Sequence, residues 1–174
     1  MFEWLFGRKA APRHTMPTVS FDSTRVTTEI RADLDATLRL TSDIPASEFA
    51  RIYQAALDSV SRGRDLAVLA QALLTIEGMT KKRAGAISRL LNNRATSLMD
   101  RQRQLGLGIK SAIWRYSGAP CADADDDLHS QLDGKKYSIE KGMAVGKRRV
   151  WPGMEEDCKC GSSVIIPGFK RTDF

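Results

Sequence analysis

The stretch that decides the fold runs from Trp114-Arg115-Tyr116-Ser117-Gly118 to Cys158-Lys159-Cys160 and closes with Ile166-Pro167-Gly168-Phe169. It holds all three cysteines and one of the two histidines of the chain. Glycine and proline recur through it, and only short runs have strand character, at 109–116, 136–139 and 163–166. This pattern of short strand-like runs separated by glycine and proline predicts a small, loop-rich α+β module over residues 109–174.

The composition is that of an ordinary globular domain. The 174 residues are 42% hydrophobic and 28% charged, and no apolar run is long enough to span a bilayer. The first nine residues contain an acid and only a short apolar run, unlike a secretory leader, so we expect a cytosolic compartment. An odd number of cysteines in that compartment favours metal binding or simple burial over disulfides.

Upstream of the module, the sequence predicts a helical scaffold over residues 22–108. Apolar residues recur with helical spacing in four segments, 22–40, 45–62, 65–77 and 80–105. The third segment is rich in alanine and leucine, so we expect it to be the most buried helix. Thr80 can cap the fourth and longest helix.

Basic residues are concentrated in one segment. Residues 81–115 contain nine lysines and arginines and a single acid, Asp100. Such a stripe predicts a contact with DNA or with an acidic partner. The alternative is a helix face whose acidic partners come from elsewhere in the fold. The candidate contact residues on the long helix are Lys81, Lys82, Arg83, Arg89, Arg94, Arg101 and Arg103.

Residues 1–21 are predicted to form an N-terminal docking arm. Phe2, Trp4 and Phe6 cannot bury one another within so few residues, so we expect them to dock on a partner subunit. A tail without fixed structure is the alternative.

Four residues of the C-terminal stretch form a candidate metal set: Cys121, His129, Cys158 and Cys160. Three thiolates and one imidazole are an accepted ligand set for structural zinc, and a small module has little core of its own. The spacing is unusual, because Cys158 and Cys160 are separated by one residue where two to four are common. Buried free cysteines with a hydrogen-bonded histidine are therefore the alternative.

Catalytic patterns are scarce. The sequence contains no nucleophile elbow, phosphate loop or zinc-protease motif, and the acidic run 123–127 lacks the glycine and the closing glutamate of a calcium loop. His129 with Asp133 could form a catalytic pair, but a histidine beside an acid is more often structural. Trp114 and Tyr116 could stack on bases, although their position in a strand favours the core.

Residues 80–169 resemble the phage Mu F-like minor head proteins, also called head morphogenesis proteins of tailed phages. The resemblance is carried by the helix ending in Leu105-Gly106 and by four motifs: Ile113-Trp114-Arg115, His129-x3-Asp133-Gly134-Lys135, Pro152-Gly153-x4-Cys158-Lys159-Cys160 and Ile165-Ile166-Pro167-Gly168-Phe169. The chain departs from the family at Lys159, where arginine is usual, and in the acidic stretch 121–127, where the family has a mixed-charge run.

The resemblance implies a minor component of the phage head that associates with the portal vertex and other head proteins during assembly, with DNA contact in some members. The sequence thus predicts a non-enzymatic virion protein with a zinc-stabilised C-terminal module. The alternative is a free zinc-dependent nucleic-acid-binding protein or nuclease.

Overall fold

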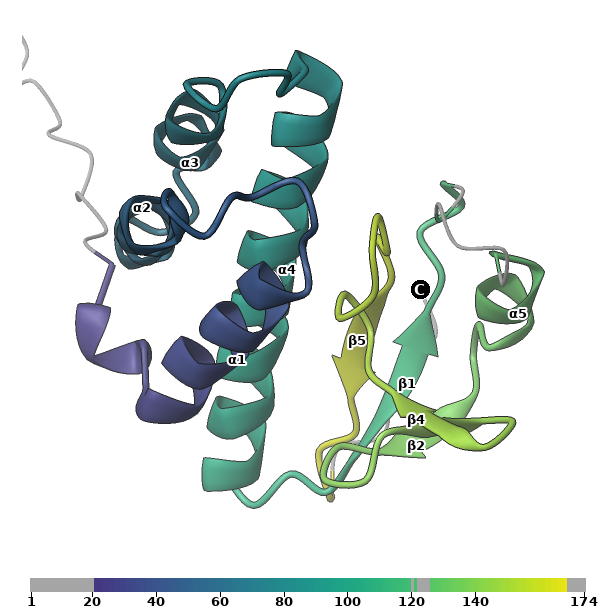
Figure 1. Ribbon diagram of the computed structural model, residues 1–174. Helices are drawn as coiled ribbons and strands as arrows, with labels where there is room; N and C mark the ends of the chain where they lie inside the picture. Colours follow the sequence, from purple (N-terminus) through teal and green to yellow (C-terminus); the bar gives the residue numbers. More distant parts are fainter. Residues whose placement is uncertain (1–20, 120, 122–125, 169–174) are drawn as a thin grey trace, which may run out of the picture.

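The computed structural model describes residues 21–119, 121 and 126–168 (Figure 1). A layer of helices packs beside a small antiparallel sheet with its attached loops, as expected for the α+β class. The predicted docking arm with Phe2, Trp4 and Phe6 lies outside the described residues. Within those ranges, no helix is both long and apolar enough to cross a membrane.

The helical layer consists of a short 3-10 helix and four α-helices: η1 (Ser23–Arg25), α1 (Thr28–Arg39), α2 (Phe49–Ser61), α3 (Leu66–Leu73) and α4 (Lys81–Gly106). Threonine side chains start two of them, because the hydroxyl oxygens of Thr27 and Thr80 accept the N–H groups of Ile30 and Arg83. The predicted N-cap of the longest helix is therefore confirmed.

Three details of the helical prediction were wrong. The segment 22–40 is divided into η1 and α1, because Asp22 and Thr27 each cap a separate helix. Helix α2 begins at Phe49, after a turn in which Glu48 N–H bonds to Pro45 carbonyl. Helix α3 ends at Leu73 and buries only Leu69 and Leu73, so it is not the most buried helix.

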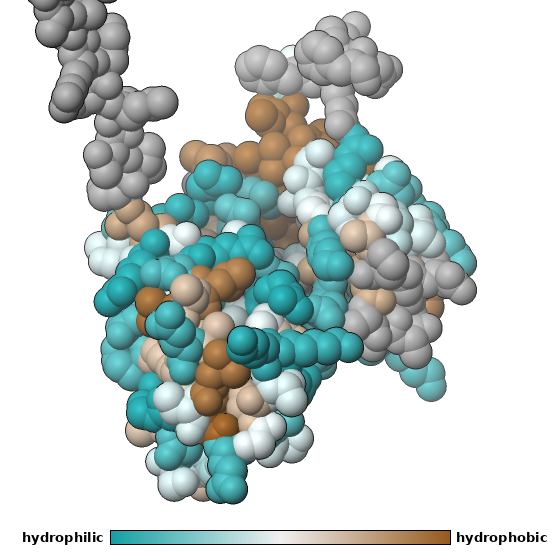
Figure 2. All heavy atoms as spheres, turned by 90° about the horizontal axis from the view of Figure 1, so that it is seen from above, coloured by the Kyte–Doolittle hydropathy of each residue, from teal (hydrophilic) through white to brown (hydrophobic). Residues whose placement is uncertain are grey.

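Helix α4 is the central helix of the molecule. It contacts α1, α2 and α3 and contributes apolar residues such as Ile87, Leu91 and Ala95 to their common core. Inside that core, the buried amide of Asn92 bonds to the hydroxyl of Ser59 on α2. Figure 1 shows that α4 also faces the sheet layer, so one helix serves both parts of the fold. Viewed from above, a mostly hydrophilic surface is interrupted by separate apolar patches (Figure 2).

The sheet layer is a second, smaller core. Strand β1 (Ser111–Arg115) lies between β2 (Lys136–Ser138) and β5 (Gly161–Val164), and both pairings are antiparallel. Strands β1 and β2 lie within the predicted runs 109–116 and 136–139, whereas β5 begins two residues before the predicted run 163–166 and ends at Val164. A separate hairpin of β3 (Met143–Val145) and β4 (Arg148–Val150) lies in a region where the sequence predicted no strand. Helix α5 (Asp126–Gln131), which the sequence reading missed, carries His129.

The loop 151–158 fastens the sheet layer to α4. Arg94 Nη1 donates to the carbonyl of Met154 over 2.7 Å, and Ser97 Oγ donates to the carbonyl of Pro152 over 2.8 Å. The guanidinium of Arg101 lies 4.6 Å from the centre of the Trp151 ring, a distance typical of a cation–π contact. Because these groups satisfy backbone carbonyls of the loop, the helix fixes the loop's conformation as well as its position.

Arg94 joins three elements, so its replacement should destabilise the fold. Its guanidinium also binds the carboxylate of Asp33 on α1 with two hydrogen bonds, one of 2.9 Å, and both side chains are largely buried. Arg94→Met leaves that carboxylate unpaired, so we expect it to lower the free energy of unfolding by about 2 kcal/mol. Urea unfolding followed by circular dichroism measures this change.

Arg103→Met is the matched control, because Arg103 lies on the same helix, is exposed in its side chain and, among the described residues, forms an ion pair only with the half-exposed Asp100. This substitution should lower the free energy of unfolding by less than about 0.5 kcal/mol. Equal effects of the two substitutions would contradict the bridging role of Arg94.

Candidate metal centre

The structure brings all four predicted metal ligands together. Cys121 follows β1, His129 lies on α5, and Cys158 and Cys160 immediately precede β5. Each residue offers one ligand atom, and these four atoms all lie within 4.8 Å of one another. All four residues are buried. Buried thiols and an imidazole at such distances form a site compatible with a structural metal ion.

The distances fit tetrahedral coordination. Nδ1 of His129 lies 3.7 Å from the sulfur of Cys158 and 3.9 Å from that of Cys160. In a tetrahedral zinc site, sulfur and nitrogen ligands are about 3.6 Å apart, which follows from bond lengths near 2.3 and 2.0 Å. The four side chains therefore need only small movements to surround an ion.

The one-residue spacing of Cys158 and Cys160, which weakened the sequence argument, has a simple structural reason. The two cysteines occupy an irregular stretch that runs directly into strand β5. In an extended segment, residues two apart point to the same side. Both sulfurs can therefore face His129, while Lys159 between them is exposed.

Glu155 completes the histidine's surroundings. Nε2 of His129 lies 2.8 Å from Oε2 of Glu155, and both atoms are buried. The contact is short but poorly aligned for a hydrogen bond, and neither atom has another hydrogen-bond partner in the described part of the chain. A carboxylate that faces the far nitrogen favours the ring orientation in which Nδ1 faces the thiols. The sequence reading missed Glu155, although it lies inside the Pro152 to Cys160 motif.

The three thiols differ in their electrostatic surroundings. The pKa of Cys158 is lowered to about 5, chiefly by the hydrogen bond from the Cys160 thiol and also by the N–H groups of Cys160 and Gly153. The same thiol–thiol hydrogen bond and burial raise the pKa of Cys160. Burial is the largest cause of the raised pKa of Cys121. One thiolate is thus stabilised by the protein alone.

Trp114 forms the wall behind the histidine. It is completely buried, and its ring meets the His129 ring edge-on with a 5.3 Å separation between ring centres. Its backbone is fixed by the turn after α5, because Gly134 N–H donates to the Trp114 carbonyl and Trp114 N–H donates to the Lys135 carbonyl. Trp114 is therefore a core residue, as its place in a strand predicted.

Asp133 does not face the histidine. Its carboxylate accepts the N–H of Tyr116 over 2.9 Å and so fixes the end of β1. The carboxylate opposite His129 is that of Glu155. The pairing of His129 with Asp133 considered from the sequence is therefore replaced by a different, buried pair.

The basic residues of α4 are partly occupied within the fold. Arg83 pairs with Asp43 and Glu156, Arg89 with Asp157 and Arg94 with Asp33, so acids from elsewhere in the fold do meet this face. Arg101 covers Trp151, and Arg103 pairs locally with Asp100. Lys81 and Lys82 are exposed and form no ion pair with any residue the structure describes. Contact of this face with DNA or an acidic partner stays a prediction.

Searches with the chain against protein-family models, curated proteins and solved structures found no match.

Replacing one ligand should unfold the sheet layer selectively. The helical core is a separate apolar cluster, whereas Cys160 belongs to the smaller cluster around Trp114. We expect Cys160→Ser to move the NMR amide signals of residues 109–168 into the narrow random-coil range. Most of the helical circular dichroism should be retained.

Lys159→Ala is the control, since Lys159 lies between the two cysteines with an exposed side chain. Its spectrum should match that of the parent protein. A native spectrum for Cys160→Ser would show that this thiol is an ordinary buried cysteine.

Proposed function

We propose that this protein is a minor head protein of a tailed phage or prophage, which joins the portal vertex during head assembly, and that a zinc ion stabilises its C-terminal module. The proposal is supported chiefly by the positions of the family-like motifs in the fold. Motifs that are far apart in the sequence form one compact unit around the Cys/His cluster.

Three of the motifs have a defined part in that unit. The Ile113-Trp114-Arg115 motif is the central strand, and its tryptophan packs against His129. The Asp133-Gly134-Lys135 turn holds the backbone of this strand. In the Pro152 to Cys160 motif, the N–H of Gly153 donates to the sulfur of Cys158 over 3.4 Å. A resemblance confined to surface residues would not account for such mutual contacts, which supports a common domain.

Zinc is the metal that best suits the ligands. Thiolate and imidazole are soft or borderline ligands, and structural zinc is commonly bound by three thiolates and one imidazole. When bound, the ion would link α5, the end of β1 and the start of β5, and so add folding free energy to a module with a small core. The residues that would hold it are Cys121, His129, Cys158 and Cys160.

The ligand set also favours a structural role over the nuclease alternative. Catalytic zinc sites usually keep a coordination position for water, with three protein ligands. Here four protein groups converge, all of them buried. Such a site supports a stabilising metal, and with it an assembly protein in preference to a hydrolase.

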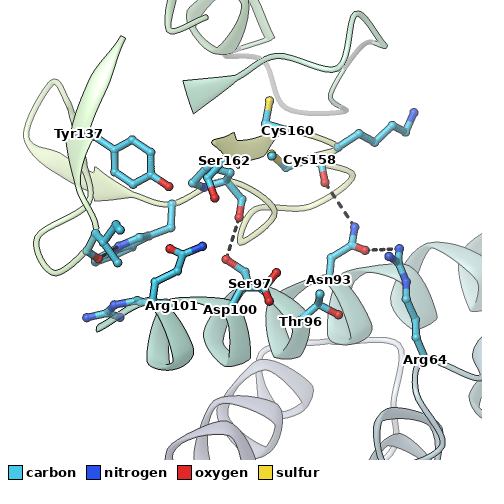
Figure 3. Close-up of a pocket in the computed structure, with 16 residues that line it drawn as sticks. Arg64, Asn93, Thr96, Ser97, Asp100, Arg101, Tyr137, Cys158, Cys160 and Ser162 are labelled. Carbon is cyan, nitrogen blue, oxygen red and sulfur yellow. Dashed lines mark hydrogen bonds between the residues drawn. The ribbon is translucent and has the colours of Figure 1, made fainter. Parts of the chain in front are cut away.

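Docking of the module on α4 is consistent with an assembly role. The loop that carries Cys158 is bound to the helix by Asn93, whose Nδ2 donates to the Cys158 carbonyl over 3.3 Å (Figure 3). A metal bound by Cys158 would therefore hold a residue that also contacts α4. A protein held in this way can present surfaces from both layers to its neighbours in the head.

The zinc proposal predicts close to one equivalent of zinc per chain after purification without chelator, measured by inductively coupled plasma mass spectrometry. Cys158→Ser should reduce the zinc content at least tenfold, because a site with three ligands holds the ion much less tightly. Lys159→Ala should retain full occupancy. Preparations that contain another metal, or none, would refute zinc at this site.

The head proposal predicts that the protein is a component of purified heads. The gene is deleted from the phage that encodes it, and lysates are compared by plaque titre and electron microscopy. We expect loss of infectious particles, restored by a tagged copy that then sediments with the heads.

Particles of normal titre and composition without the protein would contradict the head proposal. Metal-dependent degradation of DNA by the purified protein, abolished by Cys158→Ser, would favour the nuclease instead.

A further inference from the structure

The outer edge of strand β5 is an open hydrogen-bonding edge. Ile165 N–H donates to the carbonyl of Ser111 over 3.0 Å, so every second residue of this strand faces β1. By the same alternation, the N–H and C=O groups of Ser162 and Val164 point away from β1. Among the described residues, no strand pairs with that side of β5. An unpaired edge is a template for one more strand.

A groove lies along this edge. A cavity of about 950 Å³ is bounded on one side by residues 161–166 and on the other by Asp100, Arg103 and Gln104 of α4. It adjoins a second cavity of about 340 Å³, which shares Asp100, Gln104 and Ser162 with it. Figure 3 shows Asp100 on α4 and Ser162 on opposite sides of this second cavity. The two cavities therefore lie next to each other between the helix and the strand edge.

The groove has the chemistry to receive a peptide backbone with apolar side chains. Gln104 is only 8% exposed and lines both cavities, yet its amide makes no hydrogen bond within the described ranges. Its amide atoms are not among the fully buried polar atoms without a partner, so the amide reaches the cavities and can both donate to and accept from a peptide group. Val164 and Ile166 line the larger cavity and are 37% and 45% exposed. Together with the open edge, these features fit strand addition.

The N-terminal segment of the chain has the matching pattern. Phe2, Trp4 and Phe6 alternate with other residues, so in an extended conformation they share one face. Aromatic residues are also favoured in strands. The five residues from Phe2 to Phe6 are enough to pair with the four residues of β5.

The segment can reach the groove within one molecule. Phe21 lines a third cavity, which shares Asp100 and Arg103 with the groove, so the chain enters the described fold close to one border of the groove. Fifteen positions separate Phe6 from Phe21, enough to span about 50 Å when extended. This greatly exceeds the diameter of a helix, about 10 to 12 Å.

We propose that residues 2–6 of the same chain add a fourth strand to the sheet at the outer edge of β5, with the aromatic face packed on Val164 and Ile166. The residues after Gly168 are a poorer occupant. Gly168 has a φ of 85°, and Pro167 precedes it, as in a type II turn. Turns of that type splay flanking strands and do not suit a tight hairpin.

Amide hydrogen exchange of the full-length protein, followed by NMR, tests the proposal residue by residue. We expect the outward N–H groups of Ser162 and Val164 to exchange as slowly as the inward N–H of Ser163. The triple variant Phe2→Ser, Trp4→Ser, Phe6→Ser should accelerate exchange at Ser162 and Val164 by about tenfold or more and leave Ser163 nearly unchanged. Glu3→Ser with Leu5→Ser, on the opposite face of the segment, should have little effect.

Three results would overturn the proposal. The first is equally fast exchange of Ser162 and Val164 in the parent protein and the triple variant. The second is protection that is lost on dilution together with a dimer in light scattering, which would assign the groove to the arm of a second copy. The third is protection that depends on Phe169 and Phe174 and not on the aromatic residues of the arm.

Discussion

The structure depends on the short segment from Pro152 to Cys160, which is held from two sides. On one side its thiols and Glu155 enclose His129, and on the other its carbonyls accept hydrogen bonds from Asn93, Arg94 and Ser97 of α4. A loop of this kind has no regular structure of its own, so its backbone groups need partners from elsewhere. The helix supplies those partners, and the resulting geometry presents the cysteines to the histidine.

This arrangement gives several basic residues of α4 the role stated above as the alternative, pairing with acids from elsewhere in the fold. A surplus of positive charge in one segment favours a nucleic-acid contact when the segment is considered alone. In the fold, Arg83, Arg89 and Arg94 meet acids from distant segments, and Arg101 meets an aromatic ring. Much of the surplus thus serves to join the two layers. Lys81 and Lys82 remain the residues most suited to an external anionic surface.

Close backbone approach is a further requirement of the sheet layer. Gly142 has a φ of 75°, and a β-carbon there would lie 2.9 Å from both the Trp151 ring and the Val150 carbonyl. Trp151 in turn donates its indole N–H to the Ile139 carbonyl and supports Arg101. The β3–β4 hairpin therefore positions the loop that carries the metal ligands. It is part of the support of the site, although none of its residues is a ligand.

The sequence by itself determined the α+β class, the long helix capped by Thr80, the three strand runs and the identity of the four clustered residues, because periodicity, capping and ligand chemistry are local properties. Only the tertiary structure decided that Cys158 and Cys160 face the same histidine, that Glu155 and not Asp133 meets its ring, and that the arginines of α4 bind the loop. The β3–β4 hairpin and helix α5 were missed because their few residues are too short for a recognisable period. Contacts between residues 29 to 73 positions apart depend on how the layers pack, and no local pattern encodes that packing.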